Sequence, residues 1–210
     1  PALTTYKAKG VVSERSVLGL GLYAGGVAEE PFICAADLII LYGFDPVEGP
    51  PQPWRYQDKP MLELSEHVHA HSFLHPDLLL VPDIAETLGG VGDALCKPAW
   101  SNAEIAAAKE RLWTAALTPT GEGIAPSQLV QTARAAFPPE TRITIDAGAH
   151  MLPVLHLWQS SEANQSLISR GLSTMGFALP AAIAACLVDP ERPTVAFTGG
   201  GGMMMCLGEL

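Results

Sequence analysis

The chain has few charged residues, few aromatic residues and few cysteines, and each shortage narrows what it can be. Charged residues make up 16% and aromatic residues 7% of its 210 positions, against 48% apolar residues. Only 12 residues are Lys or Arg and the formal net charge is -10, which argues against nucleic acid as a partner, because phosphate backbones are bound by clustered basic side chains. No apolar run reaches the roughly 18 residues that a membrane span requires, so we expect no membrane partner.

The cysteines are too few and too scattered for a disulfide framework or a Cys-x-x-Cys motif. They stand mostly in apolar runs, and no secretory signal pattern precedes them, so we expect reduced core residues in a cytoplasmic protein. The four positions are Cys34, Cys96, Cys186 and Cys206.

What the chain does contain is an alternation of short β-rich runs with helical patterns, which predicts an α/β fold with a largely parallel sheet. A capping box, Ser101 with Glu104, opens one of the helices. The expected strands are residues 38–42, 61–64, 78–81, 142–145 and 194–197. The expected helices are residues 84–95, with Asp83 as N-cap, then 101–117, 127–137 and 174–187, with a further helix beginning near Met151.

The C-terminal end of the chain has the pattern of a phosphate cradle. The apolar run Val195 to Phe197 is followed by four glycines, Gly199 to Gly202, and then by a helix-like segment. Glycine lets the backbone approach an anion, and the free N–H groups of a first helical turn point at it. Two upstream segments strengthen this interpretation: Asp146-x-Gly148-x-His150, and the run Gly171 to Ala182, which contains Met-Gly-x-x-Leu-Pro-Ala-Ala.

These three segments, in this order, resemble the cofactor-binding domain of thiamine-diphosphate-dependent enzymes, in the acetolactate-synthase-like large-subunit group. Residues 4–10 and 36–43 also look like strands of that family's middle domain. The resemblance implies parallel-sheet three-layer α/β domains. Their expected extents are a partial middle domain over 1–100, a helix and linker over 101–122, and the N-terminal half of the thiamine-diphosphate-binding domain over 123–210.

The resemblance also implies a role for each motif residue. His150, after Gly148 and Ala149, would bind the diphosphate, and the amides of Gly199 to Gly202 would hold its other oxygens. The carbonyl of Ser173 and the N–H of Met175 would meet the aminopyrimidine, while the Met175 side chain would hold the cofactor bent. The cofactor-binding residues expected in this way are Gly148, Ala149, His150, Ser173, Thr174, Met175, Gly199, Gly200, Gly201 and Gly202.

The chain departs from the family pattern at the metal. Gly200 stands where the family has a metal-binding aspartate, so no metal ligand is expected here. The family's asparagine ligand and its catalytic glutamate lie outside this sequence, and no catalytic residue is therefore expected in it. We expect a fragment of a 2-keto acid carboligase or decarboxylase that uses thiamine diphosphate and Mg²⁺. The fragment alone would be inactive, and it would form a homo-oligomer or bind missing parts of its own chain; FAD binding is left open.

Other interpretations of the same residues stay open at this point. The chain would be a non-catalytic α/β module if Gly200 marks a lost site. Gly19 to Gly26 mimics a nicotinamide-binding loop, although a glycine turn and helix start is the favoured interpretation. His67, His69, His71 and His75 have strand spacing suited to zinc, but a solvent-facing loop is favoured. His150 alone would fit a helix cap, and Met175 alone a core methionine.

Overall fold

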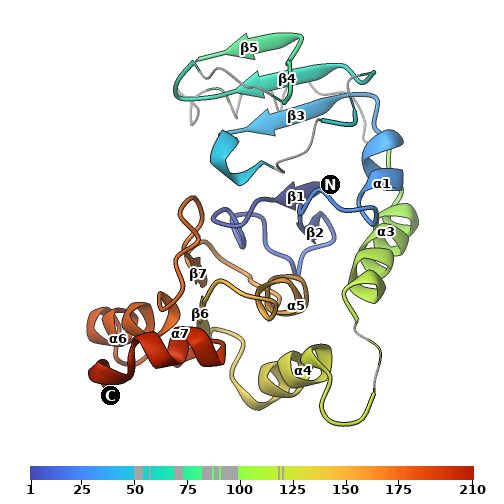
Figure 1. Cartoon of the computed structure of the whole chain (residues 1–210). Coiled ribbons are helices and arrows are strands. Elements are labelled where there is room, and N and C mark those ends of the chain that lie inside the picture. Colours follow the sequence, from blue (N-terminus) through green and yellow to red (C-terminus); the bar gives the residue numbers. More distant parts are fainter. Residues whose placement is uncertain are drawn as a thin grey trace. The chain divides into compact units, whose positions relative to one another are not determined.

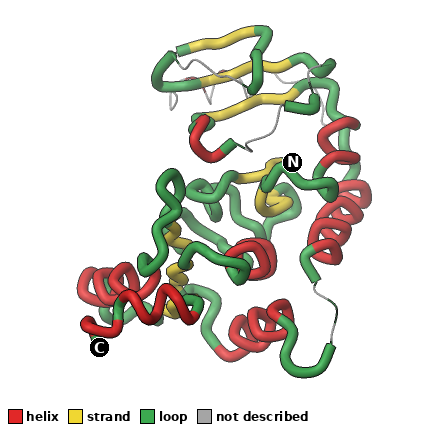
Figure 2. Tube along the Cα trace, in the orientation of Figure 1, coloured by secondary structure: helices red, strands yellow, loops and turns green. Residues whose placement is uncertain are grey.

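The computed structural model describes residues 1–49, 54–56, 58–68, 73–81, 87, 90, 99–117, 119 and 121–210. The chain separates into two compact units, the first made of Pro1–Tyr23 with Ile105–Leu210, the second of Ala24–Glu104. Each unit is built on parallel strands (Figures 1 and 2). The predicted α/β class with parallel sheets is therefore confirmed.

The first unit contains a three-stranded parallel sheet in the order β7-β6-β8. The strands are β6 (Arg142–Ile145), β7 (Ser166–Ile168) and β8 (Thr194–Phe197). Helix α5 (Met151–Leu157) joins β6 to β7, and α6 (Ala178–Val188) joins β7 to β8. Since parallel crossovers are right-handed, connections that run in opposite directions across the sheet put their helices on opposite faces.

Alternation along the central strand decides what each face carries. Ile143 and Ile145 are fully buried on one face, and Phe197, the register partner of Ile145, packs edge-on against Trp158 with ring centroids 5.7 Å apart. Thr144 and Asp146 alternate with these isoleucines and face the start of α6. Strand β6 therefore has its apolar side toward Trp158 and its polar side toward α6.

Other elements complete the first unit. Helix α4 precedes β6 and lies along α5, and a guanidinium, that of Arg134 in α4, lies 4.7 Å from the Trp158 ring centroid. A short helix α7 follows β8, and the chain ends in η2. The remaining elements of the first unit are β1 (Ala2–Thr4), β2 (Gly19–Leu22), α3 (Asn102–Ala115, from Ile105 onward), α4 (Pro126–Ala136), α7 (Gly200–Met205) and η2 (Leu207–Glu209).

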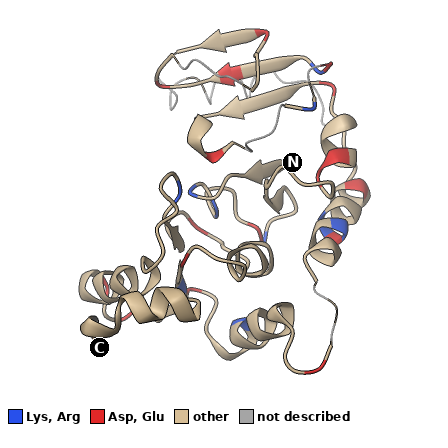
Figure 3. Cartoon of the chain, viewed as in Figure 1, with Lys and Arg blue, Asp and Glu red and all other residues tan. Residues whose placement is uncertain are grey.

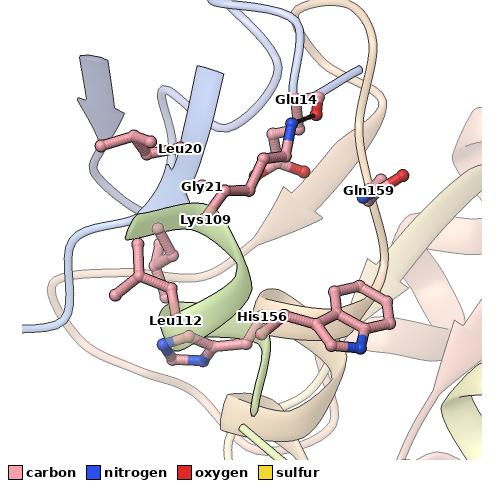
Figure 4. A pocket seen from close by; sticks show the side chains of 9 residues that line it. Glu14, Leu20, Gly21, Lys109, Leu112, His156 and Gln159 are labelled. Atoms are coloured by element: carbon pink, nitrogen blue, oxygen red, sulfur yellow. Dashed lines mark hydrogen bonds between the residues drawn. The ribbon is translucent and has the colours of Figure 1, made fainter. Parts of the chain in front are cut away.

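A buried ion pair ties the N-terminal residues to the rest of the first unit. Lys9 is fully buried, and its Nζ lies 2.5 and 2.6 Å from the two carboxylate oxygens of Glu14. The same carboxylate accepts the Ser160 N–H at 2.7 Å, and Lys109 of α3 donates to the Glu14 carbonyl (Figure 4). Burial lowers the pKa of Lys9, and the Glu14 charge opposes that shift. This pairing matters because charged residues are sparse over the described chain (Figure 3).

The second unit holds the parallel sheet β3-β4-β5. Its core includes Met61 and Leu64 of β4 and the aromatic pair Trp54 and Tyr56, whose ring centroids lie 5.2 Å apart. The bounds are α1 (Glu30–Cys34), β3 (Ile39–Tyr42), η1 (Pro46–Glu48), β4 (Met61–Leu64) and β5 (Leu78–Leu80).

Most expected elements are found within a residue or two of their predicted ends, and the Ser101–Glu104 capping box is present. One helix is wrong at its start. Helix α6 begins at Ala178, four residues after the predicted Thr174, because Gly176 adopts a φ angle of 79°, which no right-handed helix contains. The predicted helix over 84–95 lies outside the described residues apart from positions 87 and 90. The domain boundaries near 100 and 122 stay predictions.

Two further expectations are wrong. The expected turn and helix start over Gly19 to Gly26 is instead strand β2 over its first four residues, and the next helix begins only at Glu30. A Cβ at Gly19 would lie 2.2 Å from the Ser13 carbonyl oxygen, which explains that glycine without a ligand. Cys34 and Cys186 are exposed rather than in the core, whereas Cys206 is buried; all three are free thiols. Cys96 lies outside the described residues, as do His69 and His71.

The Lys9–Glu14 pair gives a test of this fold. We expect Glu14→Gln to lower the free energy of unfolding of the first unit by about 3–5 kcal/mol, because it leaves the Lys9 charge buried without compensation. Adding Lys9→Met should recover most of that loss. The Arg192–Glu162 pair, in which Glu162 is exposed, serves as control, and Glu162→Gln should cost about 1 kcal/mol or less. Urea unfolding of the four proteins measures this; equal losses for Glu14→Gln and Glu162→Gln would contradict it.

Candidate functional site

The three segments singled out in the sequence meet at one edge of the β7-β6-β8 sheet. Residues 146–150 follow β6, residues 169–177 follow β7, and residues 198–202 follow β8. All three strands are parallel, so their carboxyl ends share this edge (Figure 1). In open α/β sheets ligands bind at this edge, where neighbouring strands connect in opposite directions. Strands β6 and β7 form such a pair, since β6 connects outward to β7 and β7 connects back across β6 to β8.

The imidazole of His150 lies between two glycines of different segments. A Cβ at Gly148 would lie 2.9 Å from Cε1 of His150, and a Cβ at Gly199 would lie 3.4 Å from the same atom. Nε2 of His150 is buried and has no hydrogen-bond partner among the residues that the structure describes. His150 is the N-cap residue of α5, but its side chain makes no capping bond, so the helix-cap interpretation is wrong. An unsatisfied buried nitrogen beside glycine backbone is suited to a polar ligand group.

The four consecutive glycines are not equivalent. A Cβ at Gly202 would lie 1.9 Å from Oδ2 of Asp146, a distance that no side chain permits. A Cβ at Gly201 would lie 2.8 Å from Cε of Met175, the movable end of a flexible side chain. A Cβ at Gly200 would meet nothing within 4 Å. Only Gly202 is therefore required by its surroundings, and position 200 has room for a side chain.

Met175 lies at the end of a loop with unusual backbone angles. Gly171, Ser173 and Gly176 have φ angles of 113°, 49° and 79°. Of these, only Ser173 has a side chain, so a positive φ strains its backbone. The Met175 side chain is 44% exposed and reaches Gly201 at the start of α7. Met175 is thus neither a core methionine nor part of α6. Thr174 N–H contacts the Ser169 hydroxyl at 3.4 Å.

Asp146 joins the three segments. Its carboxylate is fully buried; Oδ1 accepts the Phe177 N–H at 3.0 Å and Oδ2 accepts the Thr198 hydroxyl at 2.8 Å. One side chain at the end of the central strand therefore holds the residue before α6 and the residue before the glycines. Asp146 begins the Asp-x-Gly-x-His segment, but the motifs did not predict a role for its side chain. They did not predict a role for Thr198 or Cys206 either. The alternation of polar with apolar residues in β6 was the available signal.

No metal centre is formed by side chains in the part of the chain that the structure describes: no three His, Cys, Asp or Glu side chains converge there. Gly200 has no ligating group, and both carboxylate oxygens of Asp146 already accept hydrogen bonds. A hard divalent cation requires oxygen ligands, usually with at least one carboxylate. The expected magnesium ion therefore does not fit the side chains present. Within the described residues, no helix has the length and apolarity needed to cross a membrane.

A small cavity elsewhere in the first unit is a different feature. It has a volume of about 20 Å³, space for roughly one water molecule. No residue of the segments 146–150, 169–177 and 198–202 lines it. Figure 4 shows Lys109 and Glu14 on one side and His156 on another. Nδ1 of His156 is 2.8 Å from the Leu152 carbonyl, a contact within its own helix. The cavity is too small for an organic cofactor.

The expected site residues are thus brought to one sheet edge. Contacts link Met175 with Gly201, and His150 with Gly148 and Gly199. Ala149, Thr174, Gly200 and Gly201 are exposed, and Gly202 is buried. Whether these residues bind a cofactor stays a prediction.

The C-terminal part of the chain, which contains these segments, matches a known protein family. Residues 146–210 match the family model described as "Thiamine pyrophosphate enzyme, C-terminal TPP binding domain". The whole chain is similar to acetolactate synthase from Bacillus subtilis, at 28% identity over 225 residues. It is also similar to catabolic acetolactate synthase from Raoultella terrigena, at 30% identity over 185 residues and 83% of this chain. Pyruvate oxidase from Lactiplantibacillus plantarum is 29% identical over the whole chain.

The chain spans much less than the full length of these curated relatives. It covers 39% of the Bacillus protein, 33% of the Raoultella protein and 36% of the oxidase.

The glycines provide a matched pair of substitutions. We expect Gly202→Ala to destabilise the first unit by several kcal/mol, on the order of an overpacked or disrupted core, since its Cβ would displace the buried Asp146 carboxylate. Gly200→Ala should leave stability unchanged or raise it by about 0.5–1 kcal/mol, because its Cβ is free and alanine favours the helix. Thermal and urea unfolding measure both. A Gly202→Ala protein as stable as Gly200→Ala would contradict the contact with Asp146.

Proposed function

Because the chain belongs with the thiamine-diphosphate-dependent enzymes, in the group of the acetolactate synthase large subunits, we propose that its C-terminal part holds the diphosphate and aminopyrimidine of thiamine diphosphate. The observation that carries this proposal is the buried, unpartnered Nε2 of His150 between Gly148 and Gly199. A phosphate oxygen would satisfy that nitrogen. Neither glycine has a side chain that would obstruct its approach.

Each segment has its own task in this proposal. His150 donates a hydrogen bond from Nε2 to the diphosphate, and backbone N–H groups of Gly199 to Gly202 supply further donors. The Ser173 carbonyl and the Met175 N–H hold the aminopyrimidine edge. Thr174, between them in the chain, sets the distance between these two backbone groups. The Met175 side chain, which reaches Gly201, would lie against the bound cofactor. When bound, thiamine diphosphate supplies a carbanion-stabilising centre for 2-keto acid chemistry, while these residues bind and orient it.

The side chains of this chain provide no carboxylate ligand for Mg²⁺ at position 200. Gly200 offers no carboxylate where the family has one, so Mg²⁺ would need ligands from backbone, water and the diphosphate. We propose that Mg²⁺ contributes less to cofactor affinity here than a carboxylate at position 200 would allow. If thiamine diphosphate does not bind at all, a non-catalytic α/β module takes the place of this proposal, and Gly200 is the observation that favours it.

For the whole protein we propose an enzyme that decarboxylates a 2-keto acid and transfers the remaining group, as a transferase or lyase. The similarity to acetolactate synthases supports this proposal. The similarity to a pyruvate oxidase leaves the acceptor undecided. We further propose a homo-oligomer, or association with further parts of its own chain. The exposed apolar side chains of α6, α7 and η2 support it: Leu187, Val188, Met204, Met205 and Leu207.

The role of His150 can be tested by binding. We expect His150→Ala to weaken thiamine diphosphate binding about 10- to 100-fold, the value of one hydrogen bond to a charged group. His156→Ala is the control, since His156 lies in α5 and, within the described residues, its side chain bonds to a carbonyl of the same helix. Isothermal titration calorimetry on the 210-residue chain measures both. If the unaltered chain binds tightly and His150→Ala binds equally well, His150 is not the diphosphate ligand.

The missing carboxylate can be restored. We expect Gly200→Asp to raise the Mg²⁺-dependent affinity for thiamine diphosphate roughly 10- to 100-fold, because a hard oxygen ligand is added where a side chain has room. Titrations with and without Mg²⁺ isolate the metal's share, and Gly200→Asn controls for side-chain size with a weaker ligand. An aspartate that changes nothing, in a chain that already binds the cofactor tightly, would show that Gly199 to Gly202 is not the metal-diphosphate turn.

A further inference from the structure

Three consecutive residues directly after Met175 are each held by a different side chain. The Gly176 carbonyl accepts from Sγ of Cys206 at 3.1 Å. The Phe177 N–H donates to Oδ1 of Asp146 at 3.0 Å, and the Ala178 carbonyl accepts from the Thr144 hydroxyl at 2.7 Å. We propose that Thr144, Asp146 and Cys206 are positioning residues that hold Met175 in place for the cofactor. This inference rests on the proposed function and adds residues to it.

All three side chains are buried and belong to other elements than the loop they hold. Thr144 and Asp146 are fully buried, and Cys206 is 8% exposed. Thr144 lies in β6 and Asp146 directly follows that strand, both toward α6, whereas Cys206 follows α7. The start of α6 is therefore attached to the central strand and to the end of α7. We call the loop clamp the three hydrogen bonds that join Cys206, Asp146 and Thr144 to residues 176–178.

The loop needs such support because its own conformation is unfavourable. Ser173 has φ of 49°, in the left-handed region where a side chain is strained, and Gly176 has φ of 79°. Strained backbone persists only where surrounding contacts impose it. Without the loop clamp, residues 173–176 would relax to other conformations. The Ser173 carbonyl and the Met175 N–H would then no longer be presented together.

The same carboxylate also fixes the other side of the site. Oδ2 of Asp146 accepts the Thr198 hydroxyl, and it fills the space beside Gly202 that a side chain would occupy. Met175 in turn meets Gly201, one residue away. The loop and the glycine turn are therefore set relative to each other through one buried group, so loss of the loop clamp should alter cofactor affinity and not only stability.

The effect on binding follows from preorganisation. A loop that adopts the competent conformation for only a fraction of the time lowers apparent affinity by that fraction. Removing one hydrogen bond, worth about 0.5–1.5 kcal/mol, should then weaken thiamine diphosphate binding about three- to tenfold. We expect this for Cys206→Ala and for the isosteric Thr144→Val. Cys206→Ser keeps a donor and should stay within about twofold of the unaltered chain.

The experiment combines two measurements on the 210-residue chain. Calorimetry gives the affinity for thiamine diphosphate, and hydrogen exchange without cofactor follows the amides of residues 171–178 beside those of β6. Cys186→Ala is the matched control, since Cys186 is an exposed cysteine of α6. The loop clamp predicts faster exchange at 171–178 alone in Cys206→Ala and Thr144→Val. A merely structural role would raise exchange in β6 as well.

The outcomes separate the two proposals. Local exchange that rises together with a three- to tenfold loss of affinity, restored by Cys206→Ser, supports the loop clamp. Unchanged exchange at 171–178, or unchanged affinity despite faster exchange, overturns it. Asp146→Ala should have the largest effect on both measurements, and if it does not fold, Cys206→Ala and Thr144→Val still decide. If the unaltered chain binds no thiamine diphosphate, the proposed function has failed, while exchange still tests whether the three bonds hold the loop.

Discussion

The carboxylate of Asp146 lies fully buried at the end of the central strand, where it is shared by the Phe177 N–H and the Thr198 hydroxyl. Burying a charged group is tolerated only when its hydrogen bonds are made. Both donors must therefore stay within reach, which fixes the start of α6 and the turn after β8 against β6. The positive end of α6 adds to the stabilisation of the charge. The rest of the site is arranged around this group.

The glycine turn illustrates how that constraint selects residues. Gly202 has no space for a Cβ because Oδ2 of Asp146 occupies it, whereas Gly200 faces open space. Gly199 to Gly202 are identical in the sequence but have different structural roles. Gly202 is a packing requirement, Gly199 and Gly201 accommodate His150 and Met175, and Gly200 is a position where the family's carboxylate would fit sterically. The departure from the family pattern at position 200 is chemical and has no steric cause.

The N-terminal residues depend on a buried charge pair. Lys9 and Glu14 neutralise each other, and Glu14 also binds Ser160 and Lys109 through its carboxylate and carbonyl. This arrangement puts residues 1–23 in the same compact unit as the C-terminal residues. The family resemblance predicts a partial middle domain over residues 1–100, and those domain bounds stay a prediction. Pairing between residues far apart in the chain cannot be read from local patterns, since it depends on which buried charges meet.

The sequence by itself determined the α/β class, the parallel strands β4, β6 and β8 to the residue, and the three segments of the candidate site, because periodicity, turn residues and motif spacing are local properties. It did not determine the start of α6, strand β2 or the exposure of Cys34 and Cys186. Those depend on tertiary contacts: the left-handed backbone at Gly176, the close approach of Gly19 to Ser13, and which side of each helix is covered. Only the folded chain brought Thr144, Asp146 and Cys206 to residues 176–178, because each of these hydrogen bonds joins residues about 30 positions apart and no local pattern links positions so distant.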